Sequence, residues 1–174
     1  MLLDYPDKKY FESFMEAVAE FSNSGPTEHH PTSEEISNRA DFLNYIQNME
    51  DRRLGRNLKP GYVPDTYLWM IADSKYCGQI SIRHRLIPAL EQFGGHIGYA
   101  VRPSERRKGY ATKALELALP YARELGLRKV LITCYKSNIA SAKIIIANGG
   151  VLQDEIQNEG HHDLTQRYWI TYRI

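Results

Sequence analysis

The chain has 174 residues, which suits a single domain with a sizeable buried core and leaves little length for a second one. Apolar residues make up 43% and charged residues 25%, as in an ordinary water-soluble globular protein. The net charge of +1 argues against nucleic acid or a membrane surface as partner. Cys77 and Cys134 stand far apart without a Cys-x-x-Cys pair, so we expect no disulfide framework, no zinc site and a cytoplasmic location.

The N-terminal part of the chain is predicted to be helical. It opens without the basic start and apolar run of a signal peptide, and no apolar stretch is long enough to span a membrane. Residues 8–21 carry apolar side chains at helical spacing. A second helix is predicted over residues 34–49, with Thr32 or Ser33 as its cap. Residues 51–65 are polar and rich in Gly and Pro, which indicates a loop.

The remainder of the chain alternates short apolar runs with helical patterns. We expect strands at residues 66–72, 76–82, 96–101, 130–133, 151–157 and 167–173. We expect helices at residues 110–126 and 137–148, and a connection of undetermined form at residues 88–95. This order predicts one domain over residues 1–174. Its fold class is α+β, with a mixed, largely antiparallel central sheet and helices on both faces.

The helix at residues 110–126 has the clearest pattern, with alanine and leucine recurring at three- and four-residue steps. Pro120 interrupts it, because proline lacks an N–H and cannot donate to the carbonyl of Glu116. We therefore expect a kink or a local break at Pro120.

A basic run separates the expected central strand from this helix. Arg106, Arg107 and Lys108 precede Gly109, and the helix follows at once. Backbone N–H groups at a helix N-terminus attract anions, and the three cations add the same sign. Gly109 has no Cβ, so a ligand can approach the main chain closely. These features predict a site for a phosphate-bearing ligand, gripped mainly by backbone amides.

The same residues resemble the acyl-CoA signature of the GCN5-related N-acetyltransferase (GNAT) family. That signature is Arg or Gln, two residues, Gly, one residue, then Gly or Ala, after a strand that ends in Val or Ile. Here it reads Arg106-x-x-Gly109-x-Ala111 after Val101.

Further features extend the resemblance. A helix, a strand and the pattern Asn138-x-x-Ser141 follow at the distances expected of the family. The resemblance covers residues 66–174 as an acyl-CoA-binding core. It implies that residues 1–65 form a variable helical segment on the acceptor side.

The resemblance implies that the chain binds acetyl-CoA as acetyl donor. The main-chain N–H of Val101 would polarise the thioester carbonyl, since in the family the central strand splays from its neighbour at this point. Asn138 and Ser141 would face the pantetheine and phosphate arm, although Asn138 also suits a plain helix cap. The cofactor-binding set implied in this way is Tyr99, Val101, Arg106, Arg107, Lys108, Gly109, Tyr110, Ala111, Thr112, Asn138 and Ser141.

The general base and the general acid are not assigned from the sequence. An unperturbed histidine titrates near neutral pH, so His96 is a candidate general base, but a lone strand histidine is often structural. Glu91 is a second candidate. Where many relatives carry a carboxylate on this strand, the register gives Gly95. Many relatives also carry a tyrosine seven residues beyond Asn138 to protonate the leaving thiolate, and here that position is Ile145.

The implied activity is transfer of an acetyl group from acetyl-CoA to a primary amine of a small molecule or peptide, by direct attack in a ternary complex. No metal is expected, because the histidine pairs at 29–30 and 161–162 lack spaced carboxylates or thiols. No nucleic acid or membrane partner is expected at a net charge of +1. A homodimer is an open option. The rival interpretation is a non-catalytic acyl-CoA-binding sensor. A nucleotide-phosphate binder is disfavoured, since Gly-x-x-x-x-Gly-Lys-[Ser/Thr] is absent.

Overall fold

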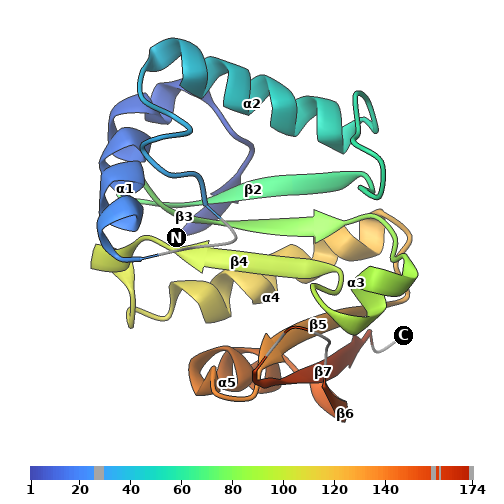
Figure 1. Cartoon of the computed structure of the whole chain (residues 1–174). Coiled ribbons are helices and arrows are strands. Elements are labelled where there is room, and N and C mark those ends of the chain that lie inside the picture. The colour runs from blue at the N-terminus through green and yellow to red at the C-terminus, as the bar shows by residue number, and fades with distance from the viewer. Residues whose placement is uncertain (26–29, 158–159, 161, 173–174) are drawn as a thin grey trace.

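The computed structural model describes residues 1–25, 30–157, 160 and 162–172. Figure 1 shows strands and helices interleaved along the chain. The strands are β1 (Leu2–Asp4), β2 (Asp65–Ala72), β3 (Lys75–Arg83), β4 (Ile97–Val101), β5 (Lys129–Tyr135), β6 (Val151–Gln157) and β7 (Leu164–Thr171). The helices are α1 (Phe11–Asn23), α2 (Arg39–Arg53), α3 (Pro88–Gln92), α4 (Tyr110–Glu124) and α5 (Ile139–Ala147), with short 3-10 helices η1 (Lys8–Tyr10) and η2 (Pro103–Glu105).

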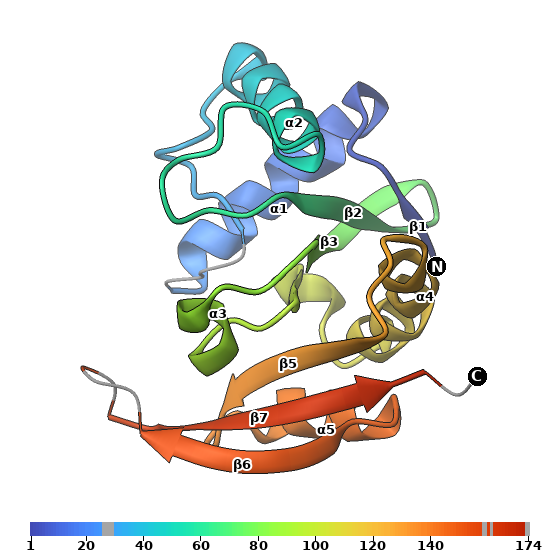
Figure 2. The ribbon, with the colours of Figure 1, turned by 90° about the vertical axis from the view of Figure 1, so that its right-hand side faces the viewer.

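The strands form two sheets. One has the order β1-β2-β3-β4 and the other the order β5-β7-β6, and every neighbouring pair is antiparallel. Figure 2 shows the second sheet lying apart from the first, with α1 and α2 on one face of the first sheet and α4 on the other. The predicted α+β class, with largely antiparallel strands and helices on both faces, is confirmed. The expected central sheet is divided in two between β4 and β5.

Two apolar cores fill the faces of the first sheet, because side chains alternate along a strand. On β2, Leu68 and Met70 face the core beneath α4, while Trp69 and Ile71 face the core beneath α1 and α2. The α4 core receives the helix stripe Ala114, Leu115, Ala118 and Ala122. The α1 core receives Phe14, Ala17, Val18 and Phe21.

The second helix begins later than predicted, and the prediction of residues 34–49 is wrong at both ends. Its cap is Asn38, whose side chain accepts from the N–H groups of Ala40 and Asp41, rather than Thr32 or Ser33. The helix α2 then continues to Arg53, which shortens the expected loop.

Two further elements differ from expectation. β1 was not predicted, since three residues are too few to show alternation, and it pairs with β2 at the edge of the first sheet. The connection at residues 88–95 contains the short helix α3.

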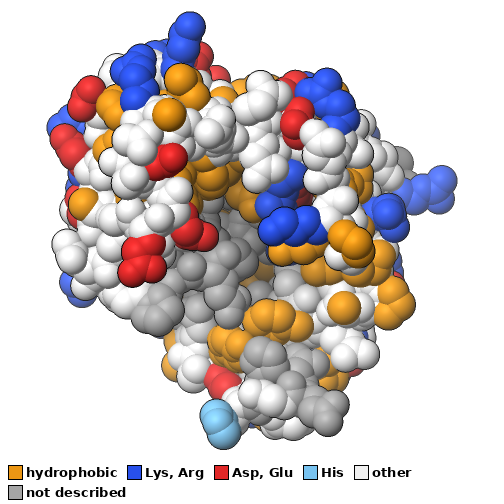
Figure 3. Space-filling view, turned by 45° about the horizontal axis from the view of Figure 1, so that its top comes forward, with side chains coloured by type: hydrophobic (Ala, Val, Ile, Leu, Met, Phe, Trp, Pro, Cys, Tyr) orange, Lys and Arg blue, Asp and Glu red, His pale blue; other side chains and the backbone are white. Residues whose placement is uncertain are grey.

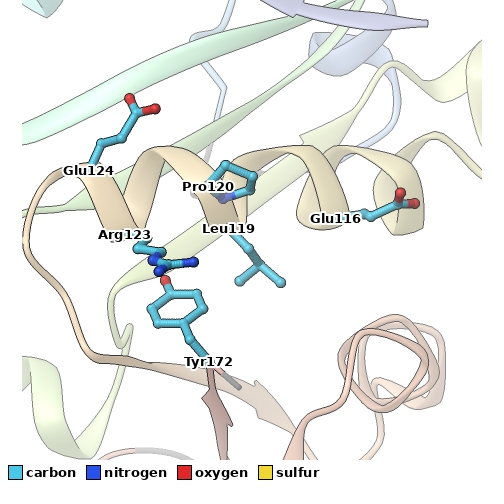
Figure 4. A pocket seen from close by; sticks show the side chains of 6 residues that line it. All are labelled: Glu116, Leu119, Pro120, Arg123, Glu124 and Tyr172. Atoms are coloured by element: carbon cyan, nitrogen blue, oxygen red, sulfur yellow. The ribbon is translucent and has the colours of Figure 1, made fainter. Parts of the chain in front are cut away.

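Pro120 does not break α4, which runs unbroken from Tyr110 to Glu124. Pro120 and Glu116 are both exposed, so the carbonyl that loses its helical partner lies on the solvent side of the helix. Figure 4 shows these two residues beside Leu119, Arg123 and Tyr172 along an open groove on the outside of α4. None of the predicted site residues lines this groove.

Some expectations fall outside the described residues. His29 and His161, one member of each histidine pair, are among them, as is Arg173 at the end of the last expected strand. In the described ranges, no helix combines the length and apolar character needed to cross a membrane. Cys77 and Cys134 are both buried and free.

Candidate active site

β4 and β5 meet at one end and separate along their length. At the junction, the N–H of His96 donates to the carbonyl of Leu131 over 2.7 Å. The N–H of Leu131 donates in return to Nδ1 of His96 over 2.9 Å. Beyond this point β4 pairs only with β3 within its sheet, and β5 belongs to the other sheet. The two strands therefore diverge into a cleft.

The main chain of β4 presents alternate residues to this cleft. The N–H of Arg102 donates to the carbonyl of Cys77, toward β3. Because hydrogen-bonded residues alternate in an antiparallel pair, the main-chain groups of Tyr99 and Val101 face the opposite side. In agreement, the carbonyl of Val101 accepts from Nε of Arg106 in the loop that follows, over 3.3 Å.

A cavity of about 650 Å³ occupies the cleft and continues past the end of β3 toward α2. Figure 3 shows a hollow on one face of the molecule, with basic side chains gathered on one of its walls. One end of the cavity is lined by Tyr99, Val101, Arg106, Ala111, Asn138 and Ser141. The structure thus brings six of the eleven predicted ligand-binding residues into the lining of one cavity.

The loop before α4 leaves amides open. Gly109 is the N-cap of α4, in the left-handed region at φ +82°, and offers no side chain to cap the helix. The first helical hydrogen bond runs from the N–H of Lys113 to the carbonyl of Gly109, over 3.1 Å. The amides of Tyr110, Ala111 and Thr112 precede this bond and are therefore uncapped by the helix. A Cβ added at Gly109 would meet no atom within 4 Å, so the space beside Gly109, where this helix begins, is open.

The three cations of the loop are exposed but differ in their partners. Arg106 lines the cavity. Arg107 has φ +62°, a conformation that non-glycine residues rarely adopt and that tightens the turn. Lys108 pairs with Glu105 over 2.7 Å. The structure therefore directs Arg106, rather than Lys108, to the cleft.

A buried arginine anchors the start of the loop to α1. Arg102 donates to Glu20 over 2.8 Å and to Glu16 over 2.9 Å. Glu20 also accepts from the N–H and the hydroxyl of Ser104. Burial raises the pKa of Glu20, but the bonds from Ser104 and Arg102 outweigh it and hold the pKa below its usual value. Arg102 was not predicted as a site residue, and its role is to position the loop.

The helix α5 supplies the facing wall. Asn138 caps it, with Oδ1 accepting from the N–H of Ser141 over 3.0 Å. The hydroxyl of Ser141 lies 2.7 Å from that of Tyr99 on β4. This pair joins the two walls of the cleft. Burial raises the pKa of Tyr99 to about 12, despite the opposing hydrogen bond from Ser141.

The two positions that depart from the family pattern have clear physical settings. Ile145 is fully buried in the core beneath α4. Gly95 has φ +58° and lies beside the β4–β5 junction, where a Cβ would come 2.5 Å from the carbonyl oxygen of Leu131. No side chain fits there, so a carboxylate at Gly95 is sterically excluded.

His96 is part of the junction between the sheets. It is 5% exposed, and its Nδ1 is engaged by the N–H of Leu131. Burial, with a smaller contribution from Arg83, lowers its pKa to about 4. It does not line the cavity. These contacts favour the structural interpretation over that of general base.

This setting predicts an acid-labile fold. Since the pKa of His96 falls from 6.5 unfolded to about 4 folded, stability is full above pH 6.5 and declines as pH drops toward 4. The loss reaches about 3 kcal/mol at most. His96→Asn keeps an acceptor for Leu131 and should remove the part of the decline that His96 causes while retaining activity, leaving the part due to His30, whose pKa burial also lowers to about 4. Urea unfolding between pH 4 and 8 measures it, and an unchanged decline in the variant would contradict the assignment.

Glu91, the other candidate base, is exposed on α3 and does not line the cavity. Its main-chain carbonyl accepts from Arg167 over 3.1 Å. Its neighbours Leu90 and Phe93 line the cavity instead. The structure thus directs Glu91 away from the site.

The cavity's other end is lined by Arg52, Tyr62, Tyr67 and Arg83. Neither arginine was predicted as a site residue from the sequence. Cys134 also lines the cavity, and burial raises the pKa of its thiol to about 11. Among the described residues, no group of three or more His, Cys, Asp or Glu is placed to hold a metal ion.

Comparisons with known proteins agree with the sequence signature. Residues 7–151 match the family model described as the acetyltransferase (GNAT) domain. No curated protein sequence matches the chain. Among solved structures, the microcin C7 self-immunity acetyltransferase MccE, in complex with acetyl-CoA and AMP, has a TM-score of 0.71 at 19% identity, covering 98% of this chain and 91% of that one.

Two further structures are similar to the same extent. The ribosomal L7/L12 α-N-protein acetyltransferase RimL, in complex with coenzyme A, has a TM-score of 0.69 at 16% identity, covering 97% of this chain and 92% of that chain. An acetyltransferase from Salmonella typhimurium that modifies the N-terminal serine of L7/L12 has a TM-score of 0.70 at 17% identity, covering 98% and 94%. At these identities the likeness concerns the fold.

Proposed function

The chain belongs to the GNAT acetyltransferase family, and we propose that it transfers an acetyl group from acetyl-CoA to a primary amine. The single observation that carries this proposal is the cleft between β4 and β5. It is bordered by an uncapped helix N-terminus at one end and by free β4 amides along its wall. The solved structures of MccE and RimL hold acetyl-CoA or coenzyme A, which supports the same donor.

The residues present fit a donor of this kind. The open space over Gly109 and the amides of Tyr110, Ala111 and Thr112 suit a pyrophosphate, since such amides favour anions. Arg106 adds a cation on the cavity wall. Hydrogen bonds to charged groups contribute roughly 1.5–3 kcal/mol each, so several amides together outweigh any one side chain.

The bound donor would supply a thioester carbonyl. The acceptor amine attacks its carbon, a C–N bond forms, the C–S bond breaks, and the CoA sulfur leaves as thiolate. Negative charge grows on the carbonyl oxygen during the attack, and the cleft-facing N–H of Val101 is the proposed donor to it, with that of Tyr99 nearby. The amine nitrogen gives up its proton to water in the same sequence.

No described residue of the cavity lining is a carboxylate or a histidine. Since these lining residues offer no such base, the proposed route is that the amine arrives neutral or loses its proton to water. A lysine-like amine with pKa about 10.4 is neutral in about one part in 10³ at pH 7, whereas an α-amino group with pKa near 7.7–8.0 is neutral in roughly a tenth. An acceptor of the second kind suits this site better.

Tyr99 is the proposed proton donor to the leaving thiolate, in place of the tyrosine replaced by Ile145. Its hydroxyl lines the cleft, and its pKa of about 12 keeps it protonated. Tyr99→Phe should lower kcat by roughly 10²-fold with little change in the Kd for acetyl-CoA. With an acetyl donor whose leaving thiol is more acidic, the decrease in kcat caused by Tyr99→Phe should be smaller. A purely structural hydroxyl would show no dependence on the leaving thiol.

The direct test is acetyl transfer from acetyl-CoA across a library of small amines and peptides. Release of free thiol and acetylated product by mass spectrometry are the two readouts. Appearance of both together supports the transferase. Tight binding of acetyl-CoA without product from any amine would favour the sensor interpretation instead.

A further inference from the structure

Two arginines, Arg52 and Arg83, line the cavity end farthest from the phosphate loop (residues 106–109), and the buried carboxylate of Asp65 lies beside them without lining the cavity. Arg52, from α2, donates from both Nε and Nη2 to Asp65, at the start of β2. Arg83 lies directly opposite Asp65 across the β2–β3 pair. The register places Asp65, Tyr67 and Arg83 on the sheet face toward α2, opposite to the face of Leu68 and Ile82.

Arg52 is held rigidly in this position. Its guanidinium lies 5.1 Å from the ring centre of Tyr67 and 5.6 Å from that of Tyr62. Asp65 is 2% exposed, so its carboxylate is committed to this ion pair. One edge of the Arg52 guanidinium, Nε and Nη2, is thus occupied by Asp65, and the residue lines the cavity.

Arg83 carries the uncompensated charge. Within the described part of the chain, Nη1 of Arg83 donates to the carbonyls of Gly94 and Gly95, over 2.9 Å in each case. No ion pair is recorded for it within that part of the chain. Burial lowers its pKa, with partial compensation from Tyr67 and Asp65. A half-buried guanidinium bound only to neutral carbonyls is favoured by a nearby anion.

The charges at this end do not cancel. Arg52, Arg83 and Asp65 together leave one net positive charge, and Tyr67 adds none, because burial raises the pKa of its hydroxyl. The same continuous cavity reaches the cleft-facing amides of β4. An acceptor whose amine meets the thioester near Val101 would extend its remaining groups toward Arg83.

We propose that Arg83, supported by Arg52, binds an anionic group of the acceptor, so that the substrate class is an amine carrying a carboxylate or a phosphate. This inference rests on the proposed acetyl transfer. The positive end would also disfavour a bound ammonium, which helps the amine to enter neutral without a protein base.

The test compares matched amines. Each pair differs by one anionic group: an amino acid and its carboxamide, and a phosphomonoester amine and the corresponding amino alcohol. Acetylation rates are measured over pH and divided by the neutral fraction of each amine. Binding of the same amines to the CoA-saturated protein is measured by calorimetry. The two pairs distinguish carboxylate from phosphate as the preferred anion.

The variants isolate the charge of Arg83. Arg83→Gln retains a donor for the carbonyls of Gly94 and Gly95 but loses the positive charge. It should reduce the preference for the anionic amine over its neutral partner by about tenfold or more, which corresponds to about 1.4 kcal/mol. Arg83→Lys should restore part of it. Arg85→Gln removes an exposed charge two residues away and should preserve it. The Kd for acetyl-CoA should stay within about twofold in all three, because Arg83 lies away from the phosphate loop.

The outcomes separate the two proposals. Turnover without an anionic preference, or a preference unchanged in Arg83→Gln, would overturn the inference and leave the transferase standing. Anionic amines that bind through Arg83 without being acetylated would support the anion site and contradict the transferase.

Discussion

Replacement of Gly109 by glutamate should abolish acetyl-CoA binding and leave the chain folded. The new carboxylate would enter the open space over the uncapped amides of α4, where the pyrophosphate is proposed to lie. It would occupy that space and repel the phosphates. No protein atom lies within 4 Å of the new Cβ, so the cost to stability is the left-handed conformation alone, about 1–2 kcal/mol.

Gly126→Glu is the matched control. Gly126 follows the other end of α4, has φ +84°, and likewise has no atom within 4 Å of an added Cβ. It should lose the same stability and retain acetyl-CoA binding. Calorimetric titration and thermal unfolding of both variants measure the two effects. Normal binding by Gly109→Glu would show that the phosphate loop is assigned to the wrong place.

Replacement of Gly95 by alanine should destabilise the chain severely and lower acetyl transfer. The Cβ would come 2.5 Å from the carbonyl oxygen of Leu131, at the junction where β4 and β5 meet. The left-handed φ of +58° costs about 1–2 kcal/mol and the overlap about 1–3 kcal/mol more. The junction holds the strands that diverge into the cleft, so its displacement should also misplace Val101.

Gly149→Ala separates strain from overlap. Gly149 has φ +85° after α5, and an added Cβ would meet nothing within 4 Å. It should lose only the conformational part, about 1–2 kcal/mol. Urea unfolding of the two variants supplies the difference. Equal losses would mean that the close approach at Gly95 does not matter.

Much of the fold could be predicted, because its signals are local. The alanine and leucine stripe of α4 and the breakers around the strands read directly from the sequence. The start of α2 could not be predicted in this way, because Ile36 is buried and apolar but lies before the helix cap at Asn38. The division into two sheets is a tertiary property, recorded only in which strands pair.

The proposed donor end of the site likewise rests on a local signal. Arg106, Gly109 and Ala111 form one contiguous motif, and the structure adds that Arg106 and Ala111 line the cleft. The proposed acceptor end has no such signal, because Arg52 and Arg83 come from segments far apart in the chain and meet only through the β2–β3 register. In the sequence, each of these arginines is simply a charged residue in a polar or strand-like segment. That pattern is too common to predict a binding site.

The most direct test of the central claim is a calorimetric titration of the wild-type protein with acetyl-CoA, run beside ATP. We expect micromolar binding of acetyl-CoA and none of ATP, because the cleft between β4 and β5 suits the pantetheine arm as well as the phosphates. Absence of acetyl-CoA binding, or equal binding of ATP, would contradict the assignment of this cleft as an acetyl-CoA site.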